Sequence, residues 1–269
     1  MTQEEVSAHS GPGYAVHPRY AIDVEVSARQ VRGVFAGQEI VRTTAALLVR
    51  ETAHKPVYYF PQADVRMDLL TRTDHSTHCP FKGDASYWTL GIGDRVSENA
   101  VWSYLDPYVE VPEIKDHVAF YWKEMDAWFE EDEEIFVHTR DPYKRIDAVP
   151  SQREVKVTVG GEIVAQSTNA HFLFETGLPT RYYLPRNDVR SDLMTSSGTV
   201  TRCPYKGIAE YYDLKIGDQT YDDLVWTYPD PIAECPKIKD LLCFFNERVD
   251  AIHVDGELVP NVKTPWSPR

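Results

Sequence analysis

The sequence predicts a mainly β fold with a minor α content, organised as two similar small domains. Three observations support this prediction: the chain repeats itself, its apolar segments are short and alternate with polar residues, and glycine-containing turns separate them. The longest apolar runs, such as residues 45–49, have the length of a strand and are too short to span a bilayer. We therefore expect each domain to be an open barrel with one or two short helices.

The internal repeat appears when the chain is aligned with itself at an offset of 124 residues. Residues 57–121 and 181–245 then match at 31 of 65 positions without a gap. Two copies of this length indicate tandem domains and not a solenoid, which needs three or more short repeats. We expect a short hinge between them and packing of the two repeats as a pseudo-twofold pair.

The repeat also sets the expected domain boundaries. The first β-rich repeat is predicted over residues 18–140 and the second over 141–264. Residues 1–17 are expected to be a flexible tail, and residues 265–269 a second tail.

Each copy contains predicted hairpins. Residues 155–159 alternate and are rich in β-branched side chains, and Gly160-Gly161 then leads into Ile163-Val164. The first copy repeats this pattern over residues 31–41. The same reasoning predicts strands at 87–90 and 211–214, each followed by a Gly-Asp turn, and a closing hairpin over 252–259.

Helices are predicted at two places in each copy. Asp64 and Asp188 each follow a proline by three residues, which predicts an N-cap and a short helix. A longer helix is predicted after Pro112 and after Pro236. Apolar residues recur there at i, i+4 and i+7, namely Ile114, Val118 and Tyr121 in the first copy and Ile238, Leu242 and Phe245 in the second.

The charge balance excludes some classes of partner. Lysine and arginine total 28 against 42 aspartates and glutamates, a formal net charge of -14. Binding to nucleic acid or to an anionic membrane depends on clustered cations, so we expect neither partner. The N-terminus has no basic segment followed by an apolar stretch, which predicts a cytoplasmic protein without a secretory signal.

The four cysteines predict reduced thiols and no zinc site, because none of them forms a CxxC pair. A metal cluster of His75, His78 and Cys79 would not repeat, since the second copy has Thr199 and Arg202 at the histidine positions. The acidic run 130–134 suits a solvated hairpin edge better than a cation site. We expect neither a metal nor a cofactor.

The most unusual motif is Thr-x-Cys-Pro-aromatic-Lys-Gly, which contains Cys79 and Lys82 and recurs with Cys203 and Lys206. A lysine three residues after the cysteine favours a thiolate if its ammonium lies near the sulfur. The competing interpretation is an unreactive cysteine beside a lysine whose stem packs on apolar residues. The sequence leaves both interpretations open.

Other residues kept in both copies complete a candidate ligand-binding site, with aromatic walls and polar anchors. The competing role for Arg66 is an internal salt bridge to Glu51 or Asp68, and Arg190 has the equivalent alternative in copy two. For the aromatic residues it is core packing. The candidate ligand-binding residues are Glu51, Tyr58, Arg66, Tyr87 and Trp102, with Glu175, Tyr182, Arg190, Tyr211 and Trp226 in the second copy.

These motifs resemble the family known as domain of unknown function 427, in which tandem members occur. The resemblance rests on Glu-Thr, Tyr-Tyr-x-Pro-x-x-Asp-Val, the cysteine motif, Trp-x-Tyr-x-x-Pro and Pro-x-Ile, all present twice. Phe81 stands where the family pattern has tyrosine. The resemblance implies a β-tent-like fold, without the paired CxxC zinc ligands of other β-tent domains. A nucleotidyltransferase label is sometimes attached to this family, but the Gly-Ser turn and Asp-x-Asp carboxylates of such enzymes are not in this sequence.

Three functional hypotheses follow. The first is a pocket in each repeat for a small polar or aromatic ligand whose identity the sequence does not give, with Cys79 or Cys203 at its floor. The second is an enzyme in which Cys79 or Cys203 is the nucleophile, Lys82 or Lys206 its activator and a glutamate the proton shuttle. The third is a protein-interaction module, which predicts an exposed apolar patch and no pocket.

Overall fold

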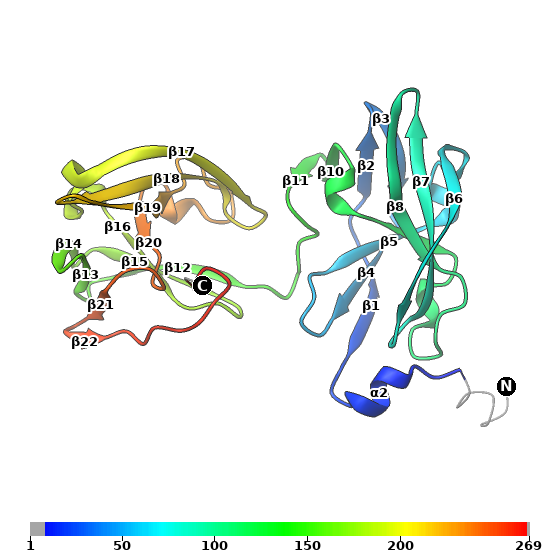
Figure 1. Ribbon diagram of the computed structural model, residues 1–269, viewed down its shortest axis with the longest axis horizontal. Helices are drawn as coiled ribbons and strands as arrows, with labels where there is room; N and C mark the ends of the chain where they lie inside the picture. The colour runs from blue at the N-terminus through cyan, green and yellow to red at the C-terminus, as the bar shows by residue number, and fades with distance from the viewer. Residues whose placement is uncertain (1–8, 268–269) are drawn as a thin grey trace. The chain divides into compact units, whose positions relative to one another are not determined.

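A computed structural model describes residues 9–267 and divides the chain after Asp141 into two compact units. Within these residues each unit contains one seven-stranded and one four-stranded sheet, and all strand pairs within these sheets are antiparallel (Figure 1). The prediction of two similar, mainly β domains is confirmed. Within the described residues both sheets of each unit have free edge strands, so none of them is a closed barrel.

In the described residues the first element of the first unit is helix α2 (Pro12–Val16), and strands follow it. The large sheet has the order β1-β4-β5-β9-β8-β7-β6, and the small sheet has the order β11-β10-β2-β3. The strands are β1 (Ile22–Val26), β2 (Val31–Phe35), β3 (Gln38–Thr43), β4 (Leu47–Glu51), β5 (Val57–Pro61), β6 (Leu70–Cys79), β7 (Gly83–Ile92), β8 (Arg95–Tyr104), β9 (His117–Phe120), β10 (Ala127–Glu130) and β11 (Glu133–Ile135).

The second unit repeats this arrangement. Its large sheet has the order β12-β15-β16-β20-β19-β18-β17, and its small sheet has the order β14-β13-β21-β22. The strands are β12 (Ile146–Ser151), β13 (Val155–Val159), β14 (Glu162–Ser167), β15 (Ala170–Glu175), β16 (Arg181–Leu184), β17 (Met194–Cys203), β18 (Gly207–Ile216), β19 (Gln219–Thr227), β20 (Leu242–Phe244), β21 (Ala251–Val254) and β22 (Glu257–Leu258).

The predicted hairpins and strands are present. Strands β2 and β3, and β13 and β14, pair across the glycine-containing turns, and β21 and β22 form the closing hairpin. The acidic run lies in the β10–β11 hairpin as expected, with one exception. Glu130 is buried, and it accepts hydrogen bonds from Arg29 and from the Tyr58 hydroxyl.

The prediction of a longer helix after Pro112 and Pro236 is wrong. Each proline starts a three-residue 3-10 turn, η3 (Pro112–Ile114) or η7 (Pro236–Ile238), and a buried central strand follows. Asp116 and Asp240 separate turn from strand with φ values of 60° and 58°, a left-handed conformation that no helix continues through. A short buried strand is apolar throughout, so its residues also satisfy helical spacing.

The short helices predicted at Asp64 and Asp188 are also 3-10 turns. Neither aspartate caps a helix, because each accepts a hydrogen bond from a hydroxyl, that of Thr43 or Ser167, at 2.6 Å. These two turns are η1 (Gln62–Asp64) and η5 (Arg186–Asp188), and the other short turns of the described residues are η2 (Met67–Leu69), η4 (Trp122–Glu124) and η6 (Ser191–Leu193). No helix in the described part of the chain has the length and apolar character needed to cross a membrane.

The large sheet of the first unit is apolar on both faces. One face packs against the small sheet and contributes Tyr58, Phe60 and Trp88 to a core with Trp128. The other face carries a second core that includes Tyr59, where the 3-10 turn η3 covers it. Because side chains alternate along a strand, neighbouring residues of β5 enter different cores.

The segment expected to be a flexible tail is ordered from residue 9 to 17, while residues 1–8 lie outside the described residues. Helix α2 contacts the first unit, and the Gly13 amide donates to the Pro80 carbonyl at 2.9 Å. A Cβ atom on Gly13 would lie 2.6 Å from the Phe81 ring, so glycine permits this close approach. An apolar partner, Phe81, therefore orders this segment.

Candidate functional site

The cysteine motif forms a tight connection between two strands, which we call the Cys-Pro turn (residues 79–83 and 203–207). Strand β6 ends at Cys79 and strand β7 begins at Gly83, with the Lys82 amide donating to the Cys79 carbonyl at 3.3 Å. Gly83 has a φ of 103°, a backbone conformation that residues with a side chain rarely adopt. The turn therefore sets the direction in which the lysine side chain leaves the backbone.

In the first unit this lysine forms a buried ion pair. The Lys82 ammonium donates to the Glu51 carboxylate, and about a tenth of each side chain is exposed. The Tyr20 hydroxyl donates to the other Glu51 oxygen at 3.0 Å, and the Lys82 ammonium lies 5.5 Å from the Tyr104 ring centre. The structure thus brings Glu51 and Lys82 together, and Cys79 begins the same turn as the lysine.

The second unit repeats the pair with one more cation. Glu175 accepts from the Lys206 ammonium at 2.5 Å and from that of Lys144 at 2.9 Å. Burial alone would raise the pKa of Glu175, but the two ammonium groups outweigh it and lower that pKa. Burial alone would lower the pKa of Lys206, but Cys203 and Glu175 outweigh it and raise that pKa. Glu175 and Lys206 are therefore both charged at neutral pH.

The second partner of this glutamate differs between the repeats. Tyr20 stacks on Phe81 with ring centres 3.7 Å apart, while its counterpart Lys144 lies over Tyr205 at 5.3 Å. Phe81 also contacts Tyr14 of helix α2. The Cys-Pro turn of the first unit is thus covered by Tyr14, which precedes the repeat, and by Tyr20 near its start.

This geometry bears on the thiol hypothesis. In both units the ammonium expected to activate the thiol is committed to a glutamate. Cys79 and Cys203 are half-buried. The remaining cysteines are poor nucleophiles, since burial raises the pKa of Cys235 to about 11 and that of Cys243 to about 12.

The two arginines do not belong to this site. Arg66 forms a two-pronged ion pair with Asp68 at 2.8 and 2.7 Å, and Arg190 forms the same pair with Asp192. The ten-residue strand β6 separates Arg66 from Cys79, which is roughly 30 Å at about 3.3 Å per residue. The local salt bridge, which was the competing interpretation, is the contact that the structure shows for both arginines.

The aromatic candidates divide between the faces of the sheet. Tyr87 and Trp102 lie in the same core as Cys79, while Tyr58 lies in the core on the opposite face. Tyr59 takes the place expected for Tyr58, because its hydroxyl accepts from the Trp102 indole at 3.2 Å. Strand alternation, visible in the sequence, is the signal that would have chosen Tyr59.

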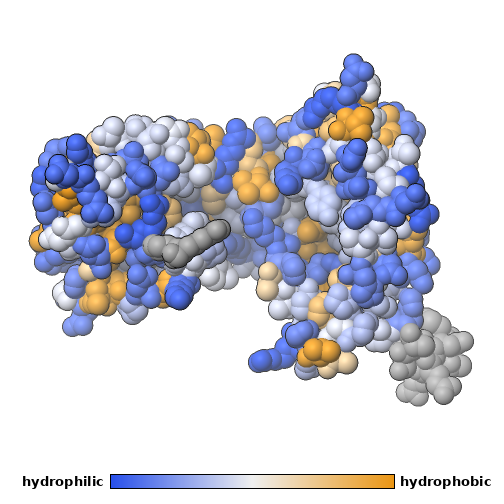
Figure 2. All heavy atoms as spheres, viewed as in Figure 1, coloured by the Kyte–Doolittle hydropathy of each residue, from blue (hydrophilic) through white to orange (hydrophobic). Residues whose placement is uncertain are grey.

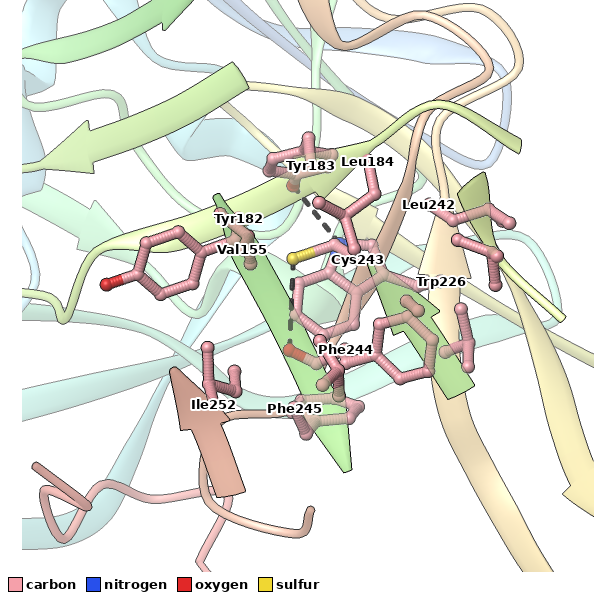
Figure 3. Close-up of a cluster of buried hydrophobic side chains, with 14 of the residues drawn as sticks. Val155, Tyr182, Tyr183, Leu184, Trp226, Leu242, Cys243, Phe244, Phe245 and Ile252 are labelled. Carbon is pink, nitrogen blue, oxygen red and sulfur yellow. Dashed lines mark hydrogen bonds between the residues drawn. The ribbon is translucent and has the colours of Figure 1, made fainter. Parts of the chain in front are cut away.

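The second unit shows the same division (Figure 3). The Trp226 indole donates to the Tyr183 hydroxyl at 3.1 Å, while the ring of Tyr182 points away from Trp226. Cys243 is fully buried among these residues. Tyr211 pairs with Thr201 through hydroxyls 2.9 Å apart, as Tyr87 does with Thr77 at 2.8 Å. Tyr182, Tyr211 and Trp226 therefore pack in the core, which was the competing interpretation of the aromatic residues.

A different cavity, of about 310 Å³, lies in the first unit where strand β5 begins. We call it the aromatic pocket. Its lining is mostly aromatic and apolar: Lys55, Pro56, Val57, Tyr58, Phe60, Trp102, Phe120, Tyr121, Trp122, Trp128, Val137, His138 and Thr139. Of the candidate ligand-binding residues of this repeat, Tyr58 and Trp102 line it.

Sequence reasoning missed the other walls of this pocket. Trp122 and Trp128 stack with ring centres 5.0 Å apart, and Trp102 contacts Tyr121 at 4.8 Å. The signal that could have found them is the difference between the copies, because Asn246 and Ile252 stand at the two tryptophan positions of the second repeat.

The corresponding place in the second unit holds an arginine. Arg181, the counterpart of Val57, pairs with Glu247 through two hydrogen bonds of 2.7 and 2.8 Å. Its guanidinium lies 5.7 Å from the Trp226 ring centre and 5.5 Å from that of Trp266. The pair is buried, and Thr264 donates to Glu247 at 2.6 Å. The second repeat therefore fills with its own side chain the space that is open in the first.

The histidines of the metal hypothesis have other partners. His78 lies 2.7 Å from Asp84, and His75 contacts Tyr87 with tilted rings whose centres are 4.5 Å apart. Among residues 9–267 no group of three or more His, Cys, Asp and Glu side chains is placed to hold a metal ion.

Comparison with known proteins identifies the repeat. No curated protein matches the chain. The family described as domain of unknown function (DUF427) matches twice, over residues 23–131 and 147–255. These two ranges cover most of the chain and coincide with the two β-rich units. The chain therefore belongs to the DUF427 family, as a tandem member with two copies of its domain.

Proposed function

We propose that this protein binds one small aromatic ligand in the aromatic pocket of its first repeat. The observation that carries the proposal is the open, aromatic-lined cavity of about 310 Å³, in a chain whose second repeat closes the same place with Arg181. Small-molecule sites are typically concave and mostly apolar, with few polar groups. The earlier hypothesis of one pocket per repeat is thereby narrowed to a single site.

The walls support an aromatic ligand because their polar atoms already have partners. The Trp128 indole donates to the Trp122 carbonyl at 3.2 Å, and the Trp102 indole donates to Tyr59. The Tyr58 hydroxyl donates to Glu130 at 3.0 Å. These rings therefore offer apolar faces, on which a planar ring packs well.

An interaction module has less support. It requires a contiguous exposed apolar patch. On the face drawn in Figure 2, hydrophilic residues cover most of each unit, and hydrophobic residues lie in small separate groups.

The test is ligand-observed NMR with a library of neutral aromatic fragments. We expect fragments to bind the wild-type protein and not a Val57→Arg/Lys123→Glu variant, which imports the arginine and glutamate of the second repeat. A Cys79→Ser variant is the matched control and keeps binding, because Cys79 does not line the pocket. Fragments bound equally by all three proteins would contradict the proposal.

A further inference from the structure

We infer that the ligand of the aromatic pocket carries a negative charge: it is a flat aromatic acid whose ring lies among the tryptophans and whose anionic group faces Lys55. This inference rests on the proposed function and adds the chemical class of the ligand. It follows from the residues by which the two repeats differ around this one place.

The differences replace an internal ion pair of the second repeat by rings and lysines in the first. From the second repeat to the first, the guanidinium and its carboxylate disappear, while ring surface and ammonium groups are added. The exchanges are Pro179 to Lys55, Arg181 to Val57, Asn246 to Trp122, Glu247 to Lys123 and Ile252 to Trp128. The second repeat contains its own cation and the anion that neutralises it. The first repeat has neither this guanidinium nor this carboxylate, because Val57 and Lys123 stand at these two positions.

The charges around the open pocket favour an anion. Lys55 is exposed at its rim, and no aspartate or glutamate lines it. Among the described residues no carboxylate lies within ion-pair distance of the Lys55 ammonium. The nearby acid Glu130 is already engaged by Arg29 and Tyr58. A cationic ligand would therefore find no free counter-charge among the lining residues, whereas an anionic one would find an ammonium.

The polar end of a ligand in the aromatic pocket would have to bind at the rim, because the walls are apolar. With the indole N–H groups of Trp102 and Trp128 already bonded, the interior offers ring faces to the ligand. His138 lines the pocket with its Nδ1 atom 2.7 Å from the Thr139 carbonyl. A ligand with an apolar ring and one terminal charge matches this division between an apolar interior and a cationic rim.

The test uses three isosteric probes that differ in charge: 2-naphthoate, 2-naphthamide and 2-naphthamidine. Calorimetric titration of the full-length protein near pH 8 should give the order naphthoate, amide, amidine from tightest to weakest. Lys55→Gln should weaken naphthoate about fivefold, the effect of one exposed charge pair, and leave the amide unchanged. Added salt should reduce the preference for naphthoate.

The variants separate this inference from the proposed function. If all three probes bind the wild type with equal affinity, or the amidine binds tightest, and Val57→Arg/Lys123→Glu abolishes binding, the pocket stands and the anionic ligand is refuted. If no probe binds the wild type, or binding survives in the variant, both are refuted. Circular dichroism checks that the double variant is folded, and Val57→Phe, which fills the cavity with an apolar ring, replaces it if it is not.

Discussion

In both repeats a lysine of the Cys-Pro turn reaches a glutamate 31 positions earlier in the chain. Burying two charges costs free energy that only their mutual attraction and further hydrogen bonds offset. Here the second carboxylate oxygen always has a partner, either the Tyr20 hydroxyl or the Lys144 ammonium. In the first unit this ion pair holds the end of β4 against the turn before β7. In the second unit it holds the end of β15 against the turn before β18.

Removing the carboxylate of one such pair should destabilise the protein strongly. Glu175→Gln leaves the ammonium of Lys206 buried without its counter-charge, and we expect a loss of about 3 kcal/mol in the free energy of unfolding. Urea denaturation measures it. Asp192→Asn, which breaks the exposed pair with Arg190, is the matched control and should leave stability nearly unchanged. Equal effects of the two substitutions would show that the buried pair has no special role.

The same pair predicts a dependence of stability on pH. The pKa of Glu175 is lowered in the folded protein, below an unfolded value of about 4.3. Its contribution is therefore complete above that pH and is lost as the pH falls through the folded pKa. The difference in unfolding free energy between wild type and Glu175→Gln should shrink from pH 7 to pH 3. A difference that stays constant over this range would contradict the prediction.

Residue-level contacts could be predicted from the sequence where they are local. The pair of Arg66 with Asp68 was one of the expected alternatives, because the two residues are neighbours in the chain. The pair of Lys82 with Glu51 depends on which strands lie side by side, which a local pattern does not contain. The filling of the second pocket by Arg181 escaped prediction for the same reason, since Glu247 lies 66 positions away.

At the scale of elements, the sequence predicts hairpins well and the central strands poorly. The β13–β14 hairpin has alternating side chains and two glycines in its turn, both local signals. Strand β9 lies between β5 and β8, is buried on both faces and loses the alternation that identifies a strand. Its four residues therefore fit a helical spacing equally well, and only the left-handed Asp116 before it breaks that interpretation.

The Cys-Pro turn gives a prediction at this scale. Gly207 has a φ of 105°, and a Cβ atom there would lie 3.2 Å from the Asp230 carbonyl, so Gly207→Ala should cost about 1–3 kcal/mol. Gly217 has a φ of 56° with open space around it, and Gly217→Ala should cost less, about 1 kcal/mol. Thermal unfolding compares them. A larger effect of the Gly217 substitution would mean that the Cys-Pro turn tolerates a side chain at Gly207.

At the scale of the whole molecule, each repeat has hydrophobic cores of its own. The clusters of the first unit use residues up to 135, and that of the second unit begins at residue 146. The fragments 1–141 and 142–269 should therefore each fold when expressed alone. Circular dichroism and cooperative thermal unfolding of each fragment test this. A fragment without a cooperative transition would show that its core is incomplete.

The two repeats have kept one fold while diverging at the aromatic pocket. Both keep the Cys-Pro turn and its ion pair, whereas the space beside Trp102 and Trp226 is open in one and filled in the other. The residues shared by both copies form the common core. The aromatic pocket is built from residues that differ between the copies, such as Trp122 and Trp128, so shared residues could not predict it.

The number of ligand molecules bound per chain tests the account most directly. Isothermal titration of the full-length protein with 2-naphthoate or with the tightest fragment should give one site per chain, and none in Val57→Arg/Lys123→Glu. Titration of Arg181→Val/Glu247→Lys, which opens the second repeat, should reveal a second, weaker site. Two equivalent sites in the wild-type protein would contradict the account, because the second repeat would then bind ligand despite its buried arginine.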